Sequence, residues 1–257
     1  MRIAIVVPCY NEEAVLPETI KRLTVVVQSL VMAGKIDVAS CMYFVDDGSR
    51  DSTWRLITEN AAMNPLVRGI KLSRNRGHQM ALLAGVLTAE GDAVISIDAD
   101  LQDDLAAIEK MLDAQRAGAD IVYGIRAKRE TDGFFKRLTA EAYYRLLSRL
   151  GVEIVFNHAD YRLMSRRAVN ALSEYNEANV FLRGIIPQLG FPAAQVFYDR
   201  HERFAGETKY PLKKTWIGDF GMSVVGAGIW FRVGSARRCR PKIAQASHFA
   251  RPTGRGV

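Results

Sequence analysis

Cysteine is scarce in this chain, and the cysteines that occur are far apart. Cys9, Cys41 and Cys239 are the three in 257 residues. Their spacing matches no metal-binding pattern, and an odd number of cysteines is poorly suited to a framework of disulfide bonds. We therefore expect neither a zinc site nor disulfide bonds, and we expect the protein to work in a reducing cytosol.

The sequence also lacks the glycine-rich loops that hold phosphates in several nucleotide-binding folds. No G-x-G-x-x-G follows the first apolar run, and no G-x-x-x-x-G-K-[ST] occurs anywhere. These absences argue against a nicotinamide cofactor and against a P-loop. A nucleotidyltransferase should likewise carry a glycine-rich loop near its start, and this chain has none.

Long apolar runs are missing as well. The run at residues 2–8 is too short for a secretory signal peptide. Residues 215–231 are largely apolar but contain Asp219 and four glycines. They fall short of the roughly 20 residues that cross a bilayer. We therefore expect no complete membrane anchor.

Acidic residues are absent from the segment 232–257, which carries seven positive charges. The whole chain has a net charge of +7, so residues 1–231 sum to zero. The basic character thus belongs to the tail, and we expect no nucleic-acid partner. Cations of this kind attract an anionic leaflet by about 1 kcal/mol each near the surface. We expect peripheral association with a membrane surface, although a solvated basic arm would have the same composition.

The sequence does contain an alternation of short apolar runs and helical periodicity. Strands are predicted at 2–7, 42–45, 67–72, 94–97 and 121–123, and helices at 15–31, 52–59, 79–89 and 104–117. This alternation predicts an α/β fold with a mainly parallel sheet flanked by helices on both faces. We expect residues 1–212 to form one catalytic domain and residues 213–257 a short C-terminal appendage.

Polar side chains follow the predicted strands at the points where they end. The pairs are Asn11/Glu12, Asp46/Asp47, Arg74/Arg76 and Asp98/Asp100. Because parallel strands bring their carboxyl ends to one edge of a sheet, we expect a binding cleft at that edge. Asp98 and Asp100, with the amide oxygen of Gln102, form an all-oxygen set typical of Mg²⁺ or Mn²⁺ sites. A solvated acidic turn is the alternative for this stretch taken alone.

Several segments together resemble the family 2 inverting glycosyltransferases. They are Pro8-Cys9-Tyr10-Asn11-Glu12, Asp46-Asp47-Gly48-Ser49, Asn75-Arg76-Gly77, Asp98-Ala99-Asp100-Leu101-Gln102-Asp103, Gly124-x-Arg126-x-x-Arg129, Asp160-Tyr161-Arg162-Leu163 and Arg203-x-x-Gly206-Glu207-Thr208-Lys209-Tyr210. Within the family, the chain is similar to the polyprenyl-phosphate group, which includes dolichol-phosphate mannosyltransferase and bacterial undecaprenyl-phosphate glucosyltransferases. The resemblance covers about residues 1–212 and implies a GT-A-type nucleotide-diphospho-sugar transferase fold.

The resemblance implies transfer of a sugar from a nucleotide-diphosphate sugar, which we expect to be UDP-glucose, to a polyprenyl phosphate such as undecaprenyl phosphate. The donor would be bound by Pro8, Tyr10, Asn11, Glu12, Asp46, Asp47, Arg76 and Asp98. Mg²⁺ or Mn²⁺ would be bound by Asp98, Asp100 and Gln102. The acceptor phosphate would be bound by Arg126, Arg129, Arg137 and Arg203, and the catalytic residues would be Asp98, Asp100, Arg126 and Arg203.

The resemblance also implies a place of action, the cytoplasmic side of the inner membrane. Members of this group continue into two membrane-spanning helices after the Lys-Tyr-Pro block. Here residues 215–231 make at most one poor candidate for such a helix, and residues 232–257 do not resemble the family. We therefore expect a peripheral or weakly anchored protein. A homo-oligomer, which relatives build through those helices, stays an open expectation.

Alternatives remain at this point. A glycosyltransferase with a saccharide hydroxyl as acceptor would need a carboxylate base, for which Asp160 is available. A non-catalytic protein recruited to membranes by its basic tail would share the composition. His78 either hydrogen-bonds the diphosphate or lies at the surface, and Arg129 and Arg137 either reach the site or belong to the solvated face of a helix at 134–150.

Overall fold

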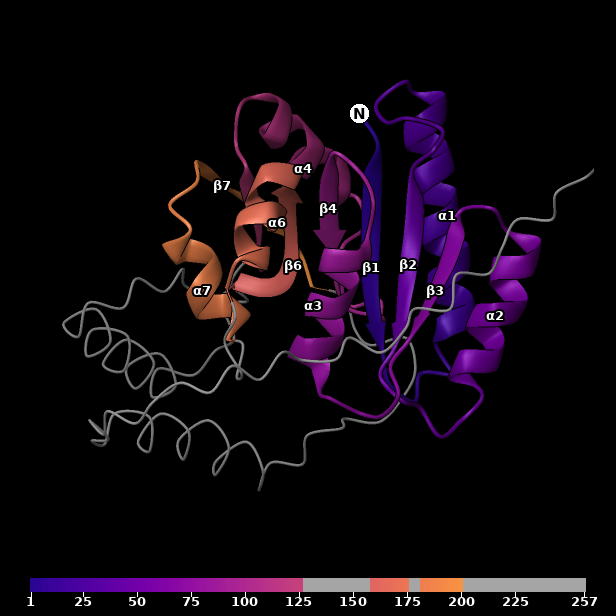
Figure 1. Cartoon of the computed structure of the whole chain (residues 1–257). Helices are drawn as coiled ribbons and strands as arrows, with labels where there is room; N and C mark the ends of the chain where they lie inside the picture. The colour runs from indigo at the N-terminus through magenta and orange to yellow at the C-terminus, as the bar shows by residue number, and fades with distance from the viewer. Residues whose placement is uncertain (127–157, 176–180, 201–257) are drawn as a thin grey trace, which may run out of the picture. The chain divides into compact units, whose positions relative to one another are not determined.

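The computed structural model describes residues 1–126, 158–175 and 181–200. These residues form a seven-stranded sheet in the order β3-β2-β1-β4-β6-β5-β7 (Figure 1). The strands are β1 (Ile3–Cys9), β2 (Cys41–Asp46), β3 (Val67–Lys71), β4 (Ala93–Ser96), β5 (Ile121–Arg126), β6 (His158–Ser165) and β7 (Ala193–Tyr198). The helices are α1 (Leu16–Met32), α2 (Thr53–Met63), α3 (His78–Thr88), α4 (Ala107–Arg116), α6 (Arg166–Ser173) and α7 (Leu182–Gln188).

The parallel part of the sheet forms from the apolar runs of the sequence. β1 lies between β2 and β4, pairs parallel with both, and is buried along its whole length. β2 also pairs parallel with β3, and β5 pairs parallel with β7. The carboxyl ends of β1, β2 and β4 lie at the lower edge of the sheet in Figure 1. The predicted α/β fold with a mainly parallel sheet is confirmed, and each predicted strand is present with slightly shifted ends.

Two strands, β6 and β7, were not predicted. β6 runs antiparallel between β4 and β5, and β7 is the edge strand beyond β5. In the register of β4 and β6, Ser96 lies opposite Arg162. The first half of β6, which includes Asp160, therefore reaches the same edge of the sheet at which β4 ends.

Two layers of helices enclose the sheet. The core on one face is built with α1, α2 and α4, and it includes Tyr161 and Leu163 of β6. The core on the other face is built with α3, α6 and α7, and it includes Met164 of the same strand. Because side chains alternate along a strand, the side chains of Asp160 and Arg162 lie on the second face of the sheet, which α3 and α7 cover. α3 lies very close to the sheet, since a Cβ on Gly85 would be 2.4 Å from Cγ1 of Val6.

The helix predicted at 104–117 begins only at Ala107. The preceding residues are held in a turn, because Asp104 Oδ1 accepts a hydrogen bond from the Ala106 N–H at 2.9 Å. Asp103 also forms an isolated antiparallel bridge with Arg200. This bridge connects the loop after β4 to the end of β7.

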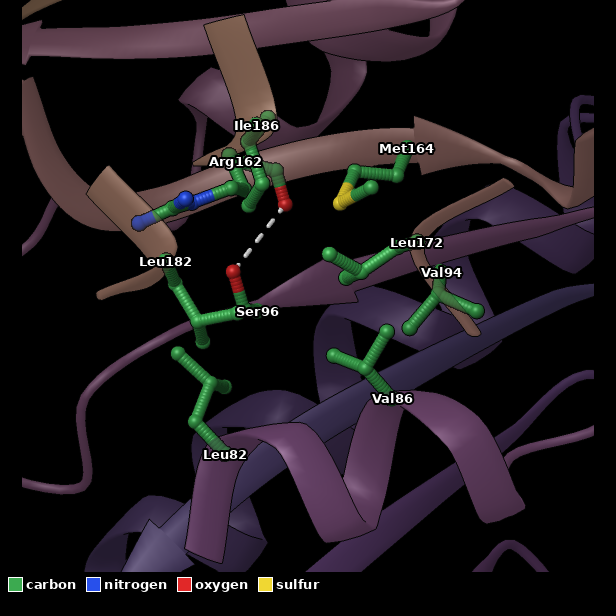
Figure 2. Close-up of a pocket in the computed structure, with 9 residues that line it drawn as sticks. All are labelled: Leu82, Val86, Val94, Ser96, Arg162, Met164, Leu172, Leu182 and Ile186. Carbon is green, nitrogen blue, oxygen red and sulfur yellow. Dashed lines mark hydrogen bonds between the residues drawn. The ribbon is translucent and has the colours of Figure 1, made fainter. Parts of the chain in front are cut away.

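A cavity of about 10 Å³ lies between the sheet and α3, α6 and α7 (Figure 2). Its lining is mostly aliphatic and consists of Leu82, Val86, Val94, Ser96, Arg162, Met164, Leu172, Leu182 and Ile186. A space of this size holds about one water molecule, so it is no substrate site. The guanidinium of Arg162 extends away from these apolar side chains in Figure 2.

None of the helices in the described part of the chain is both long and apolar enough to cross a membrane. The helix predicted at 134–150, the predicted domain end at residue 212 and the tail at 213–257 lie outside the described residues.

Candidate functional site

The loops after β1 and β2 are connected by side chains of the predicted donor site. Asn11 adopts a left-handed backbone with φ of 51°. Its Oδ1 accepts a hydrogen bond from the Arg50 N–H at 2.8 Å, and its own N–H donates to Ser49 Oγ at 3.0 Å. The Glu12 N–H donates to Thr53 Oγ1 at 2.8 Å. The motif around Asn11 and Glu12 therefore orders the loop that contains Ser49, and Pro8 and Tyr10 precede it on the same edge.

Asp46 and Asp47, at the end of β2, accept hydrogen bonds from backbone N–H groups of the loops after β2 and β3. Asp46 is fully buried, and its Oδ1 accepts from the Ser49 N–H at 3.1 Å, whereas its Oδ2 has no hydrogen-bond partner among the described residues. Asp47 accepts from the backbone N–H groups of Arg76, at 2.6 Å, and Gly77, at 2.9 Å. Burial raises the pKa of Asp47, although these two hydrogen bonds oppose the shift. Direct contact of either carboxylate with a nucleotide stays a prediction.

Gly48 allows the loop after β2 to lie close to the loop after β3. Its φ is +69°, a left-handed conformation that favours glycine. A Cβ at this position would be 2.6 Å from the backbone nitrogen of Asn75. The Asp46-Asp47-Gly48 turn thus packs directly on the loop that contains Arg76, whose side chain is exposed.

The acidic turn, residues 98–103, follows β4 at the centre of the edge. Leu101 has φ of 57°, which is strained for a residue with a branched side chain. The Gln102 N–H donates to Asp100 Oδ1 at 3.2 Å. Thr19 of α1, which is 1% exposed, donates its hydroxyl to the Ala99 carbonyl at 2.8 Å. The turn that carries the carboxylates of Asp98 and Asp100 is therefore fixed to α1 by this hydrogen bond.

Asp98 lies beside His78, the first residue of α3. Asp98 Oδ1 is 3.6 Å from His78 Nε2, and about 30% of the Asp98 side chain remains exposed. Loss of hydration raises the pKa of Asp98 to about 6; His78 opposes this shift, while Asp103, Asp160 and Asp100 add to it. The charge of His78 also opposes the rise in the pKa of Asp47. The loop after β4 therefore lies beside the start of α3 at His78.

Asp160 is the centre of a buried ionic cluster. Its Oδ1 accepts from Arg162 Nη2 at 2.6 Å, and its Oδ2 is 3.1 Å from His78 Nε2. Arg183 Nε and Nη2 of α7 approach the two carboxylate oxygens at 3.3 Å each. Burial alone would raise the pKa of Asp160, but the hydrogen bond from His78 and the charges of Arg162 and Arg183 lower it well below its usual range.

Arg126 lies on the opposite side of the acidic turn, at the end of β5. Its Nη2 donates to Asp103 Oδ1 at 3.3 Å, and its Nε donates to the Tyr198 hydroxyl at 3.3 Å. The Tyr198 hydroxyl donates in turn to Asp103 Oδ1 at 2.6 Å. Asp103 is 3% exposed, and no hydrogen-bond partner for its Oδ2 is found in the part of the chain that the structure describes. The charge of Asp103 raises the pKa of Arg126 despite the opposing effect of burial.

Carboxylates and guanidiniums lie together around the acidic turn. Within the described residues, Asp98, Asp100, Asp103 and Asp160 are accompanied by Arg126, Arg162, Arg183 and Arg200, and Asp104 adds a further carboxylate at the end of the turn. A divalent cation bound at the turn would add positive charge, which favours binding of the negatively charged diphosphate of a nucleotide sugar.

Asp98 and Asp100 fit a hard divalent cation. Both are partly exposed carboxylates on one turn, and a bound cation would stabilise the charged form of Asp98, which loss of hydration disfavours. The described residues contain no group of three or more His, Cys, Asp or Glu side chains arranged to hold a metal ion. Mg²⁺ and Mn²⁺ commonly take one or two carboxylates and complete their shell with water and substrate phosphates. The Gln102 Oε1 accepts a hydrogen bond from Arg200 instead, so its role as a ligand stays a prediction.

The structure thus brings Asp98, Asp100, Gln102 and Arg126 to one edge, with the loops of Asn11, Asp47 and Arg76 beside them. The other predicted phosphate ligands, Arg129, Arg137 and Arg203, lie outside the described residues. Sequence reasoning missed Arg183 and Tyr198, because no motif marked α7 or β7. His78 lies in the site rather than on a remote surface.

Comparison with known proteins places this geometry in context. The family model described as "Glycosyl transferase family 2" matches residues 4–173. A Bacillus subtilis protein named uncharacterized glycosyltransferase YkoT is 54% identical over 214 residues, which are 82% of this chain and 64% of that protein. The prophage bactoprenol glucosyl transferase homolog of Escherichia coli K12 is 38% identical over 239 residues, 91% of this chain and 76% of its own length. The bactoprenol glucosyl transferase of Shigella phage SfV is 39% identical over 217 residues, 84% and 69% of the two chains.

Solved structures show the same fold. Glucosyl-3-phosphoglycerate synthase from Mycobacterium tuberculosis, crystallised with Mn²⁺, UDP and phosphoglyceric acid, has a TM-score of 0.59 and 21% identity, and the match covers 89% of this chain and 80% of that one. The mannosyltransferase PcManGT from Pyrobaculum calidifontis, in complex with GDP-Man and Mn²⁺, has a TM-score of 0.58 and 18% identity, with coverage of 87% and 62%. These neighbours are GT-A glycosyltransferases, and the predicted GT-A-type fold is confirmed.

Proposed function

Because this chain belongs to glycosyl transferase family 2, we propose that it transfers a glucosyl group from a nucleotide-diphosphate sugar to a polyprenyl phosphate, with inversion at the anomeric carbon. The observation that carries the donor half is the pair of partly exposed carboxylates, Asp98 and Asp100, on one turn at the edge of the sheet where β4 ends. A divalent cation bound there would attract the diphosphate of the donor. The family assignment makes the donor a sugar nucleotide.

The acceptor half of the proposal rests on relatives. Proteins 38% and 39% identical to this chain are named as bactoprenol glucosyl transferases or their homologue. Bactoprenol is a bacterial polyprenol, so a polyprenyl phosphate is the acceptor class that these names support. The glucosyl group in the same names supports UDP-glucose as the donor. The chain spans 64% of the length of the Bacillus subtilis relative, so the activity of the whole protein is part of this proposal.

The chemistry agrees with the residues at the site. An oxygen of the acceptor phosphate would form a bond to the anomeric carbon while the bond from that carbon to the diphosphate breaks and the nucleoside diphosphate leaves. The attacking oxygen is already anionic, so no general base is needed. A bound Mg²⁺ or Mn²⁺ at Asp98 and Asp100 would neutralise charge that builds on the departing diphosphate. Arg126, anchored by Asp103 and Tyr198, would orient the acceptor phosphate by a charge-assisted hydrogen bond.

Asp160 is a poor candidate for the base that a saccharide hydroxyl acceptor would need. Such an acceptor needs a base near its hydroxyl group, and a useful base has a pKa near the working pH. Two arginines and His78 contact the Asp160 carboxylate and hold its pKa well below the usual range. A carboxylate so strongly stabilised in its charged form is a poor proton acceptor.

The proposed reaction is set at the cytoplasmic face of the plasma membrane, where nucleotide sugars and polyprenyl phosphates meet. The seven cations of residues 232–257 would contribute peripheral attraction to anionic lipids. Flotation with vesicles that contain anionic lipid tests this part. A protein that stays in the soluble fraction at low salt would refute it.

The direct test of the proposal is a transfer assay with the full chain. Purified protein, Mn²⁺ or Mg²⁺ and undecaprenyl phosphate are incubated with UDP-glucose, GDP-mannose or UDP-GlcNAc, and lipid-linked sugar is detected by mass spectrometry. We expect a glucosyl-phosphoryl lipid and metal-dependent release of UDP. Absence of product and of nucleotide release with every donor would favour a non-catalytic binding protein instead.

A further inference from the structure

The cluster around Asp160 contains more positive charge than its structure needs. Asp160 and Arg162 are both buried, with side-chain exposures of 6% and 2%, and they are 2.6 Å apart, so each already neutralises the other. Arg183 adds a second cation to the same carboxylate, although 45% of its side chain is exposed. Because the guanidinium of Arg183 is partly in water, its attraction to Asp160 is screened and stabilises the fold less than the buried pair of Asp160 and Arg162 does. The position of Arg183 therefore calls for another explanation.

His78 lies on the path from Arg183 to the acidic turn. Its Nε2 is 3.1 Å from Asp160 Oδ2 and 3.6 Å from Asp98 Oδ1, and 35% of its side chain is exposed. Arg183 and His78 come from different helices, α7 and α3, but share the oxygen atom Asp160 Oδ2. Asp160 thereby fixes both side chains on the side of Asp98 that faces away from Arg126.

We propose that Arg183 and His78, held by Asp160, form a phosphate-binding pair at the edge of the acidic turn. The ligand would be a phosphate group of a reactant, because His78 Nε2 lies 3.6 Å from Asp98 Oδ1 and shares the oxygen Asp160 Oδ2 with Arg183. Arg183 keeps part of its guanidinium exposed, and an arginine that is already oriented loses less freedom when it binds phosphate. This inference rests on the proposed function and adds Arg183, which none of the sequence motifs identified.

Two phosphates could occupy this pair, the diphosphate of the donor and the phosphate of the acceptor. The location favours the donor, since Arg126 is on the other side of the turn and is held there by Asp103 and Tyr198. The two reactants would then be bound by separate cationic groups on the two sides of Asp98. The experiment below separates these sources.

The test compares Arg183→Gln with a matched control, Arg167→Gln. Arg167 of the neighbouring helix α6 is also an exposed arginine that binds a buried carboxylate, Asp120, but it lies at the opposite edge of the sheet, where β5 begins. Binding of UDP, GDP, UMP and GMP to the full chain is measured by calorimetry with Mn²⁺, and the KM for undecaprenyl phosphate is measured in the transfer assay. Thermal melting of each variant verifies folding.

For Arg183→Gln, we expect the affinity for the preferred nucleoside diphosphate to fall by about 10- to 100-fold, as for loss of one charge-assisted hydrogen bond. Affinity for the corresponding monophosphate should change much less. If the KM for undecaprenyl phosphate rises by that factor instead, the pair binds the acceptor phosphate. Arg183→Lys, which keeps the charge, should recover part of the loss and covers the case in which Arg183→Gln folds poorly.

The proposal is overturned if Arg183→Gln changes neither the diphosphate affinity nor the acceptor KM by more than Arg167→Gln does. Failure of the proposed function would look different, because the wild-type chain itself would then form no lipid-linked sugar. A wild-type chain that binds none of these nucleotides and no polyprenyl phosphate would overturn both.

Discussion

Removal of a single buried hydroxyl group should impair the acidic turn without touching its carboxylates. Thr19 donates its hydroxyl to the Ala99 carbonyl at 2.8 Å, between Asp98 and Asp100 in the chain. The variant Thr19→Val keeps the branched shape of the side chain and removes the donor. The Ala99 carbonyl would then lose the only side-chain donor that the described residues offer it.

The expected magnitude follows from the burial of this hydrogen bond. Thr19 is 1% exposed, and an unsatisfied buried polar group costs about 1 to 3 kcal/mol. The turn is already strained at Leu101, where a left-handed backbone costs on the order of 1 to 3 kcal/mol. With the restraint removed, the turn can relax away from the geometry that binds a cation. We expect the Mn²⁺ concentration for half-maximal activity to rise about 5- to 100-fold, with a melting temperature a few degrees lower.

The assay is sugar transfer as a function of Mn²⁺ concentration for four proteins: wild type, Thr19→Val, Thr19→Ser and Thr24→Val. Thr19→Ser keeps the hydroxyl and should resemble wild type. Thr24 is on the same helix and accepts a hydrogen bond from Asn64 Nδ2 at 3.0 Å, away from the acidic turn. Its valine variant is therefore the control for loss of a threonine hydroxyl. An unchanged Mn²⁺ requirement in Thr19→Val would refute the reasoning.

Three further predictions concern the site and the fold. Asp100→Ala should abolish metal-dependent transfer with little change in melting temperature, and retained transfer would remove Asp100 from the cation site. Tyr198→Phe removes the two hydrogen bonds through which the tyrosine hydroxyl bridges Arg126 and Asp103 and leaves only their direct hydrogen bond, so the KM for the polyprenyl phosphate should rise about 3- to 30-fold; Tyr43→Phe, which loses a hydrogen bond from the Glu90 N–H, is the control. The pKa of Asp120 is lowered by its hydrogen bonds from Arg167; because the folded pKa is depressed, the stabilisation is present above about pH 4 and is lost as the pH falls further. Asp120→Asn should therefore flatten the acid side of the stability curve, measured by chemical denaturation between about pH 2 and 6.

The central fold could be predicted because its strands are continuous apolar runs. β1 and β4 are buried on both faces, and such strands can be recognised without knowledge of their partners. β6 could not be recognised this way, since Asp160 and Arg162 interrupt its apolar residues. These two charges are tolerated in a buried strand only because each neutralises the other across 2.6 Å, which is a tertiary fact.

Those parts of the site that directly follow a predicted strand could also be predicted. Asp98 and Asp100 follow a predicted strand directly, so their place at the edge of the sheet came from local sequence. The partners of Asp160 come from positions 82 residues away, at His78, and 23 residues away, at Arg183. No spacing rule connects residues at such distances, because the contacts depend on how α3 and α7 pack over the sheet.

The alternation of side chains along β6 has a consequence for sequence variation in this protein. Along this strand, odd and even positions face different halves of the molecule, and a deletion of one residue would exchange them. Tyr161 and Leu163 would then enter the ionic layer, while a carboxylate and a guanidinium would be forced into hydrocarbon. Natural variants of β6 should therefore differ by replacement and not by length, and Asp160 and Arg162 should be kept or lost as a pair.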